Sequence, residues 1–155
     1  MSLLRTLDWP PVWTVAFMAL ASGAAELWSP LGTLLLWPGR LLIAAGLGLA
    51  LWAALAFARA RTTIIPRERP SGLVATGPFR YTRNPIYVAD LLILAGWVLT
   101  TGQPIALVMI WALKQILETR FVLLEETVLT VDLGESYRSW AATVPRWLGL
   151  ERYGL

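Results

Sequence analysis

The feature that most constrains the fold of this chain is an uninterrupted run of 18 uncharged residues from Leu41 to Ala58. At about 1.5 Å per residue, a helix of this length extends over about 27 Å, close to the thickness of the hydrocarbon core of a bilayer. The whole chain is 57% hydrophobic and 15% charged, and its mean hydropathy is +0.60. These values indicate an integral membrane protein, and the long apolar runs predict an all-α fold.

Further apolar stretches predict four transmembrane helices. The predicted spans are residues 11–28, 40–58, 85–101 and 104–124. The turn at 100–104 is short and uncharged, so the third and fourth spans are expected to form a helical hairpin. The first span has a second interpretation as a signal peptide, because small residues cluster at 19–25, but its length favours a retained helix.

The distribution of arginines predicts the orientation in the membrane. Six arginines lie in the loop 59–84 and four lie after Leu117, whereas the two opposite loops offer only Arg40. Because positive residues collect on the cytoplasmic side, this loop, the helical tail 125–155 and both termini are expected to be cytoplasmic. The chain 1–155 is predicted to be one domain, in the inner (plasma) membrane if the source is bacterial.

The residue types that are missing exclude several kinds of site. The chain has no cysteine and no histidine, so it has no disulfide and none of the usual ligands of a transition metal. No zinc spacing, nucleotide-binding glycine loop or nucleic-acid motif is present. The sequence therefore predicts neither a metal site nor a nucleic-acid partner, and it leaves the oligomeric state open.

A charged and aromatic segment precedes the third span. Asn84 is a good N-cap and Pro85 suits the first helical position, so a helix is predicted to start here. Its free N–H groups, with Arg80 and Arg83, would form an anion site. The alternative is that these arginines only fix the topology and touch anionic headgroups.

Charged residues also occur within the predicted hairpin. Lys114, Glu118 and Glu125 fall within about 40° on a regular helix, which predicts a polar stripe that faces the protein interior. If the turn is centred on Gly102, Asp90 and Lys114 reach the same depth and are expected to form an ion pair. The rival hypothesis is that Asp90 contacts a cationic acceptor amine.

Several short motifs follow one another in a specific order. They are Arg83-Asn84-Pro85-x-Tyr87, Gly96-Trp97, Glu125-Glu126-x-x-Leu129, Gly134-x-x-Tyr137 and Val144-Pro145-Arg146. Over residues 62–147 this pattern resembles the integral-membrane methyltransferases, which comprise isoprenylcysteine carboxyl methyltransferases and phospholipid N-methyltransferases. The resemblance implies S-adenosylmethionine as the cofactor, a lipid or other hydrophobic methyl acceptor, and contact with membrane lipids.

Methyl transfer from a sulfonium requires that the protein align donor and acceptor and exclude water. The cofactor-binding residues that the resemblance implies are Arg83, Asn84, Pro85, Tyr87, Gly96, Glu125, Glu126 and Tyr137. The candidate catalytic residues are Tyr87, Asp90 and Arg146. Asn84 stands where many members have histidine, and Thr143 where some carboxyl-methylating members have arginine, so a lipid amine is at least as good an acceptor candidate as a prenylcysteine.

Each of these residues also has an interpretation without function. The two glutamates fit an exposed acidic pair, the two tyrosines fit an interfacial aromatic belt, and Gly96 with Trp97 fits simple helix packing. At the level of the whole protein, two other classes stay open. These are a nicotinamide-dependent membrane reductase with a related core, and a membrane scaffold without enzymatic activity.

Overall fold

The computed structural model describes residues 8–27, 33–60, 72–103 and 107–149, and within these ranges the secondary structure is helical without a strand. The first three α-helices are α2 (Pro10–Leu27), α3 (Leu36–Ala60) and α4 (Pro85–Thr101), with a 3-10 turn η1 (Gly77–Arg80) before α4. Their bounds lie within a few residues of the predicted spans 11–28, 40–58 and 85–101. The all-α prediction is therefore confirmed for the described residues.

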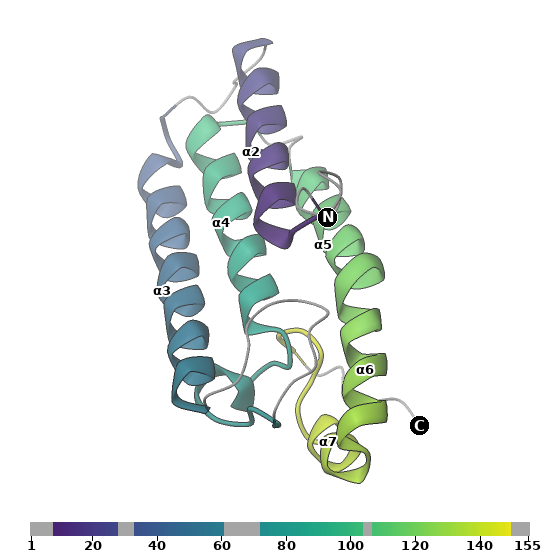
Figure 1. Cartoon of the computed structure of the whole chain (residues 1–155). Coiled ribbons are helices and arrows are strands. Elements are labelled where there is room, and N and C mark those ends of the chain that lie inside the picture. The colour runs from purple at the N-terminus through teal and green to yellow at the C-terminus, as the bar shows by residue number, and fades with distance from the viewer. Residues whose placement is uncertain (1–7, 28–32, 61–71, 104–106, 150–155) are drawn as a thin grey trace.

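The described part of the fourth predicted span, from residue 107 on, belongs to a longer helical segment. This segment consists of α5 (Leu107–Leu117), a π turn η3 (Glu118–Val122) and α6 (Leu123–Leu133), which together form one long rod (Figure 1). The rod continues beyond residue 124, the predicted end of the membrane span, and Gly134, whose φ is 55°, closes α6. The tail then continues with the short helix α7 (Glu135–Ala141), as predicted for this stretch.

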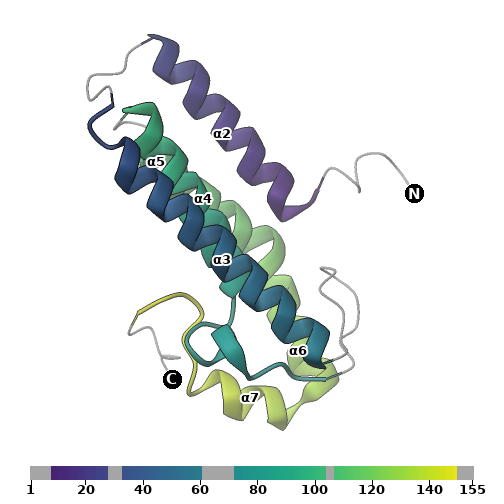
Figure 2. The same cartoon turned by 90° about the vertical axis from the view of Figure 1, so that its left-hand side faces the viewer.

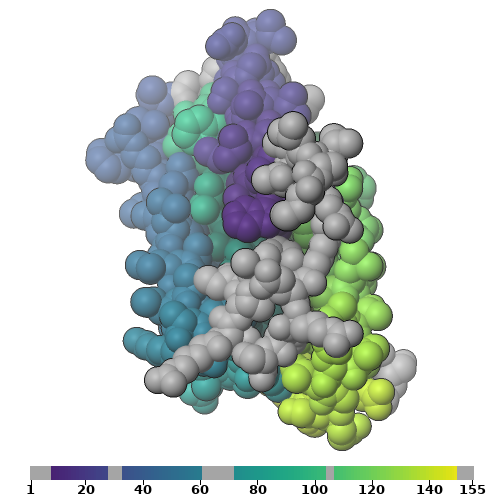
Figure 3. All heavy atoms as spheres, viewed as in Figure 1, coloured from purple at the N-terminus to yellow at the C-terminus, as the bar shows by residue number. Residues whose placement is uncertain are grey.

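The central element of the fold is α4. It contacts α3 most extensively, and also α2 and α5. In the space-filling view α4 shows only as a narrow strip between α2 and α3 (Figure 3). By length and composition, α3 is the one described helix that can cross a membrane, whereas α4 is apolar but shorter. The arrangement of four membrane spans stays a prediction.

Glycines bring α3 and α4 into close contact. A Cβ atom added at Gly46 would lie 2.9 Å from the Ala89 carbonyl oxygen, and one added at Gly96 would lie 2.5 Å from the Gly39 carbonyl oxygen. Gly48 lies about half a turn after Gly46 on α3, and an added Cβ there would have nothing within 4 Å. The surroundings of Gly96 therefore agree with the interpretation as helix packing. The structure places this predicted cofactor residue against α3.

Helix α2 covers only one half of the bundle. Both views show that it begins about midway along the α5–α6 rod (Figures 1 and 2). At this point Arg120 pairs with Asp8 at 3.3 Å and lies over the Trp13 ring, 5.4 Å from its centroid. Further along, the Trp97 indole of α4 donates to the Met18 carbonyl oxygen. The other half of the rod, with α7 and the tail, extends beyond α2.

The α3–α4 contact predicts different effects of two similar substitutions. Gly46→Val should destabilise the protein by about 1–3 kcal/mol, because its side chain must displace the α4 backbone. Gly48→Val changes the same helix where space is open, so its effect should stay within about 0.5 kcal/mol. Unfolding in detergent measures both, and equal stabilities would contradict the assigned contact.

Candidate functional site

The start of α4 is tied to the C-terminal tail. Asn84 occupies the N-cap position and Pro85 the first turn, as predicted, but the Asn84 side chain does not cap the helix. Its amide donates instead to the Arg146 carbonyl oxygen at 3.0 Å, and the Thr82 hydroxyl donates to the same oxygen at 2.9 Å. The Arg83 N–H donates to the Pro145 carbonyl oxygen at 2.9 Å. Residues 82–84 thus bind the backbone of the tail.

A carboxylate of α6 lies between two arginines. Glu126, which is 8% exposed, is 2.9 Å from Arg83 and accepts two bonds from Arg146, at 2.6 and 3.1 Å. Arg146 also donates to Glu118 at 3.0 Å. The bonds to Glu126 in particular raise the pKa of the Arg146 guanidinium above its usual range. This network joins the α4 start, the long rod and the tail.

The sequence predicted that Arg83 and the helix start form an anion site, but in the structure the Arg83 guanidinium pairs with a carboxylate of the protein itself. It is buried against Glu126, and it also donates to the Tyr137 hydroxyl at 3.5 Å. Arg80 lies exposed at the end of η1. The sequence could not show this pairing, because Glu126 is 43 positions away along the chain.

The π turn η3 decides which glutamate reaches Arg146. Eight residues separate Glu118 from Glu126, so on a regular α-helix they would point about 80° apart. A π turn accommodates one additional residue, which brings the two side chains to within about 20°. The predicted stripe of Lys114, Glu118 and Glu125 is therefore wrong in its last member. Glu126 takes that position and Glu125 is turned away from it.

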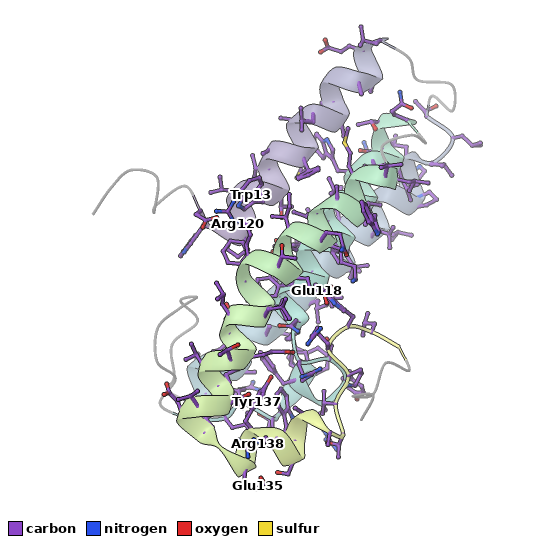
Figure 4. All side chains as sticks on the ribbon, turned by 90° about the vertical axis from the view of Figure 1, so that its right-hand side faces the viewer. Trp13, Glu118, Arg120, Glu135, Tyr137 and Arg138 are labelled. Carbon is purple, nitrogen blue, oxygen red and sulfur yellow. The ribbon has the colours of Figure 1, made fainter. Side chains whose placement is uncertain are left out.

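Glu125 faces the other half of the predicted site. It accepts a 2.6 Å hydrogen bond from the Tyr87 hydroxyl, and the Tyr87 ring lies near Phe121, with centroids 6.3 Å apart. Tyr87 and Tyr137 are both buried within the protein, so the interpretation as an interfacial belt is wrong for them. Figure 4 shows Tyr137 below Glu118, where α6 faces α7.

The structure thus brings most of the predicted residues together. The group comprises Arg83, Asn84, Pro85, Tyr87, Glu125, Glu126, Tyr137 and Arg146. Gly96 lies apart from it, against α3. Glu118 was predicted to belong to the polar stripe, but not to bind Arg146, and the 28 residues between them give no local signal for the pair.

The predicted ion pair between Asp90 and Lys114 is wrong. Lys114 pairs with Glu118 on its own rod at 2.8 Å and lies over the Trp147 ring, 5.0 Å from its centroid. Asp90 faces α2, where the Thr14 side chain lies beside it, while the Thr14 hydroxyl donates to the Pro10 carbonyl oxygen at 3.3 Å. Equal depth in a hairpin did not suffice, because the two side chains project toward different neighbours.

Comparison with known families favours one of the functional classes. The sequence profile described as phospholipid methyltransferase matches residues 34–136, well over half of the chain. The chain belongs to the phospholipid methyltransferase family. This family of membrane methyltransferases acts on lipids, so the match favours a methyltransferase over the reductase and scaffold alternatives. No curated protein and no solved structure matches the chain.

The family match covers α4 and the rod but ends before the last part of the cluster. Arg83 and the two glutamates lie within the matched residues, whereas Tyr137 and Arg146 follow them. The contacts described above are what connect these later residues to the matched region.

The network around Glu126 predicts a large effect on stability. Glu126→Gln should destabilise the protein by about 2–4 kcal/mol, because it leaves Arg83 buried without its carboxylate and weakens the hold on the partly exposed Arg146. Glu135→Gln provides a matched control, since Glu135 forms only a 3.8 Å pair with Arg138 at the surface. Thermal unfolding in detergent would disprove the structural role if the two variants unfold alike.

Proposed function

We propose that the chain is an S-adenosylmethionine-dependent methyltransferase that acts on a lipid or other hydrophobic acceptor at the cytoplasmic membrane face. The observation that carries this proposal is the cluster at the start of α4. Two arginines, two glutamates and two tyrosines from distant parts of the chain meet there in a family of lipid methyltransferases.

The residues present suit such a cofactor. Its ribose hydroxyls and amino group need acceptors, and its carboxylate needs donors. Glu125 supplies an acceptor, while Asn84 and the arginines supply donors. The indole N–H groups of Trp147 and Trp140 are buried without a hydrogen-bond partner in the described part of the chain. Since buried donors are normally paired, these two are consistent with a polar ligand beside the cluster.

S-adenosylmethionine would supply an electrophilic methyl group on a sulfonium. Glu125 would bind polar cofactor groups, and Tyr87 would orient Glu125 and present its ring to the positive charge. Asn84 and Pro85 would fix the start of α4 beside the cofactor's carboxylate end. Tyr137 would close the site from α7, and it also contacts Arg83.

Glu126 and Arg146 have a positioning role in this proposal. The Glu126 carboxylate holds both arginines, and Arg146 in turn holds the tail against α4. The tail would then cover the site at the start of α4 and exclude water from the reacting groups, as methyl transfer requires. Loss of Arg146 would therefore reduce turnover by loosening this cover.

The proposed topology follows the charges of the folded chain. Four spans, with the third and fourth as a hairpin, would place both termini in the cytoplasm. The end of α3, which carries Arg59, lies at the same end of the bundle as the start of α4 and the cluster, whereas the start of α3, which Leu34 precedes, lies at the opposite end (Figure 1). In a bacterium this membrane would be the inner membrane, where the soluble cofactor is available from the cytoplasm.

Cofactor binding tests the assignment of Glu125. Glu125→Gln should weaken the binding of S-adenosylhomocysteine tenfold or more, which corresponds to about 1.4 kcal/mol per factor of ten. Calorimetry in detergent measures this affinity, with Glu135→Gln as the control and NADPH as the competing ligand. Binding of NADPH but not of S-adenosylhomocysteine to the wild-type protein would refute the proposed function.

Single cysteines test the topology, because the natural chain has none. Leu34 is 75% exposed between α2 and α3, and Glu135 is exposed on α7. A membrane-impermeant thiol reagent added from the cytoplasmic side should label Glu135→Cys and spare Leu34→Cys. Labelling of both from that side, or the reverse pattern, would contradict the proposed orientation.

A further inference from the structure

An acidic side chain on α4 has no counterion among the described residues. Asp90 is the one charged residue of α4 and is 7% exposed. Its Oδ2 atom is buried without a hydrogen-bond partner among the described residues, and the side chain beside it on α2 is the uncharged Thr14. Burial of such a group in an apolar bundle is costly unless something compensates it. Packing alone would be served better by an apolar residue.

The helices around Asp90 offer no cation for it. The charged residues within α2 and α3 are Glu26, Arg40 and Arg59, all of which lie near helix ends. On α5 the cation is Lys114, which is taken by Glu118 and by the Trp147 ring. None of these described cations is therefore available to pair with Asp90.

The position of Asp90 links it to both the candidate site and the membrane. It lies three residues after Tyr87, so the two side chains occupy neighbouring positions on one side of α4. Thr14 is in the second turn of α2, directly after the level at which Asp8, Trp13 and Arg120 meet (Figure 4). An ion pair beside a tryptophan is typical of the headgroup level of a bilayer. Asp90 is therefore on the membrane side of the cluster, where a lipid headgroup would arrive.

We propose that Asp90 is the catalytic proton acceptor for a lipid amine, which enters the site as an ammonium and must be deprotonated before it is methylated. This inference rests on the proposed function and adds the acceptor atom to it. Thr14 packs beside the carboxylate and helps to position it, and the unpaired Oδ2 atom is left for the acceptor. An ammonium supplies both the missing positive charge and the missing hydrogen bond.

The step balances without a further reactant. One N–H bond of the ammonium breaks, its proton moves to Oδ2 of Asp90, and the electron pair stays on nitrogen. A bond from this nitrogen to the methyl carbon then forms as the bond between that carbon and sulfur breaks, with the electron pair of the latter staying on sulfur. The positive charge passes from sulfur to nitrogen, and Asp90 later returns its proton to water.

A carboxylate acceptor does not suit this position. Two carboxylates close together in an apolar bundle repel each other, so an acidic acceptor would raise the cost of keeping Asp90 charged. A carboxylate is also already nucleophilic near neutral pH and needs no base. The surroundings of Asp90 therefore favour an amine over the carboxyl group of a prenylcysteine.

The test follows the transfer of a labelled methyl group to two acceptors in detergent micelles. One is dioleoyl phosphatidylethanolamine, and the other is a farnesylated cysteine with a free carboxylate. The variants are Asp90→Asn, Thr14→Val and, as a matched control, Asp132→Asn, because Asp132 is an exposed acid on α6. Binding of S-adenosylhomocysteine and thermal unfolding are measured for each protein.

The wild-type protein should methylate the amine and not the carboxylate. Asp90→Asn should lower kcat for the amine about 100-fold or more, as expected for loss of a general base, with cofactor affinity within twofold. The decrease of wild-type kcat toward low pH should be absent in this variant. Thr14→Val should lower kcat less, and Asp132→Asn should behave as wild type.

Two results would overturn the inference. The first is an Asp90→Asn protein that binds the cofactor and retains kcat within threefold. The second is a wild-type protein that methylates the carboxylate and not the amine, which decides the matter even if Asp90→Asn fails to fold. A wild-type protein that binds no S-adenosylhomocysteine would instead refute the proposed function, and the inference with it.

Discussion

The ion pairs that Glu126 forms with Arg83 and Arg146 hold the polar half of this protein together. Arg83 precedes α4, Glu126 lies on the long rod, and Arg146 belongs to the tail, so one carboxylate joins three segments. A buried charge is tolerable only when it is paired and hydrogen-bonded. Removal of one member of the network would leave a buried charge without its partner and would destabilise the fold. The backbone bonds between residues 82–84 and 145–146 fix the same junction.

The π turn is what allows this network to form beside a second acidic residue of different orientation. Glu125 and Glu126 are adjacent, so their side chains diverge by about 100° on a helix. One is directed to the arginines and the other to Tyr87. Two identical side chains thereby acquire different surroundings, one beside two arginines and one beside a tyrosine. A π turn redirects side chains without ending the helix, and such turns occur often at functional sites.

The apolar half of the bundle supports this arrangement from the other side. Close contact of α3 with α4 through Gly46 and Gly96 makes α4 a rigid, buried support for the residues at its start. Helix α2 covers one side of α4, and it starts at the border of the polar half, next to the contact of Asp8 with Arg120. Asp90 lies at this border. Its carboxylate is the one polar group on α4 for which the neighbouring helices provide an incomplete set of partners.

The sequence by itself determined the helical class, the bounds of α2, α3 and α4 to within a few residues, and the family through its ordered motifs. Uncharged runs and the Asn84-Pro85 start are local signals, and local signals can be read along one chain. Only the tertiary structure decided that Lys114 pairs with Glu118 instead of Asp90, that Glu126 instead of Glu125 joins the polar stripe, and that Asn84 binds the tail instead of capping its helix. Those outcomes depend on one extra residue in a helical turn and on contacts between distant segments. The regular periodicity of the sequence predicts neither the extra residue of the π turn nor these contacts. Which side chains face each other is fixed only when the helices pack together.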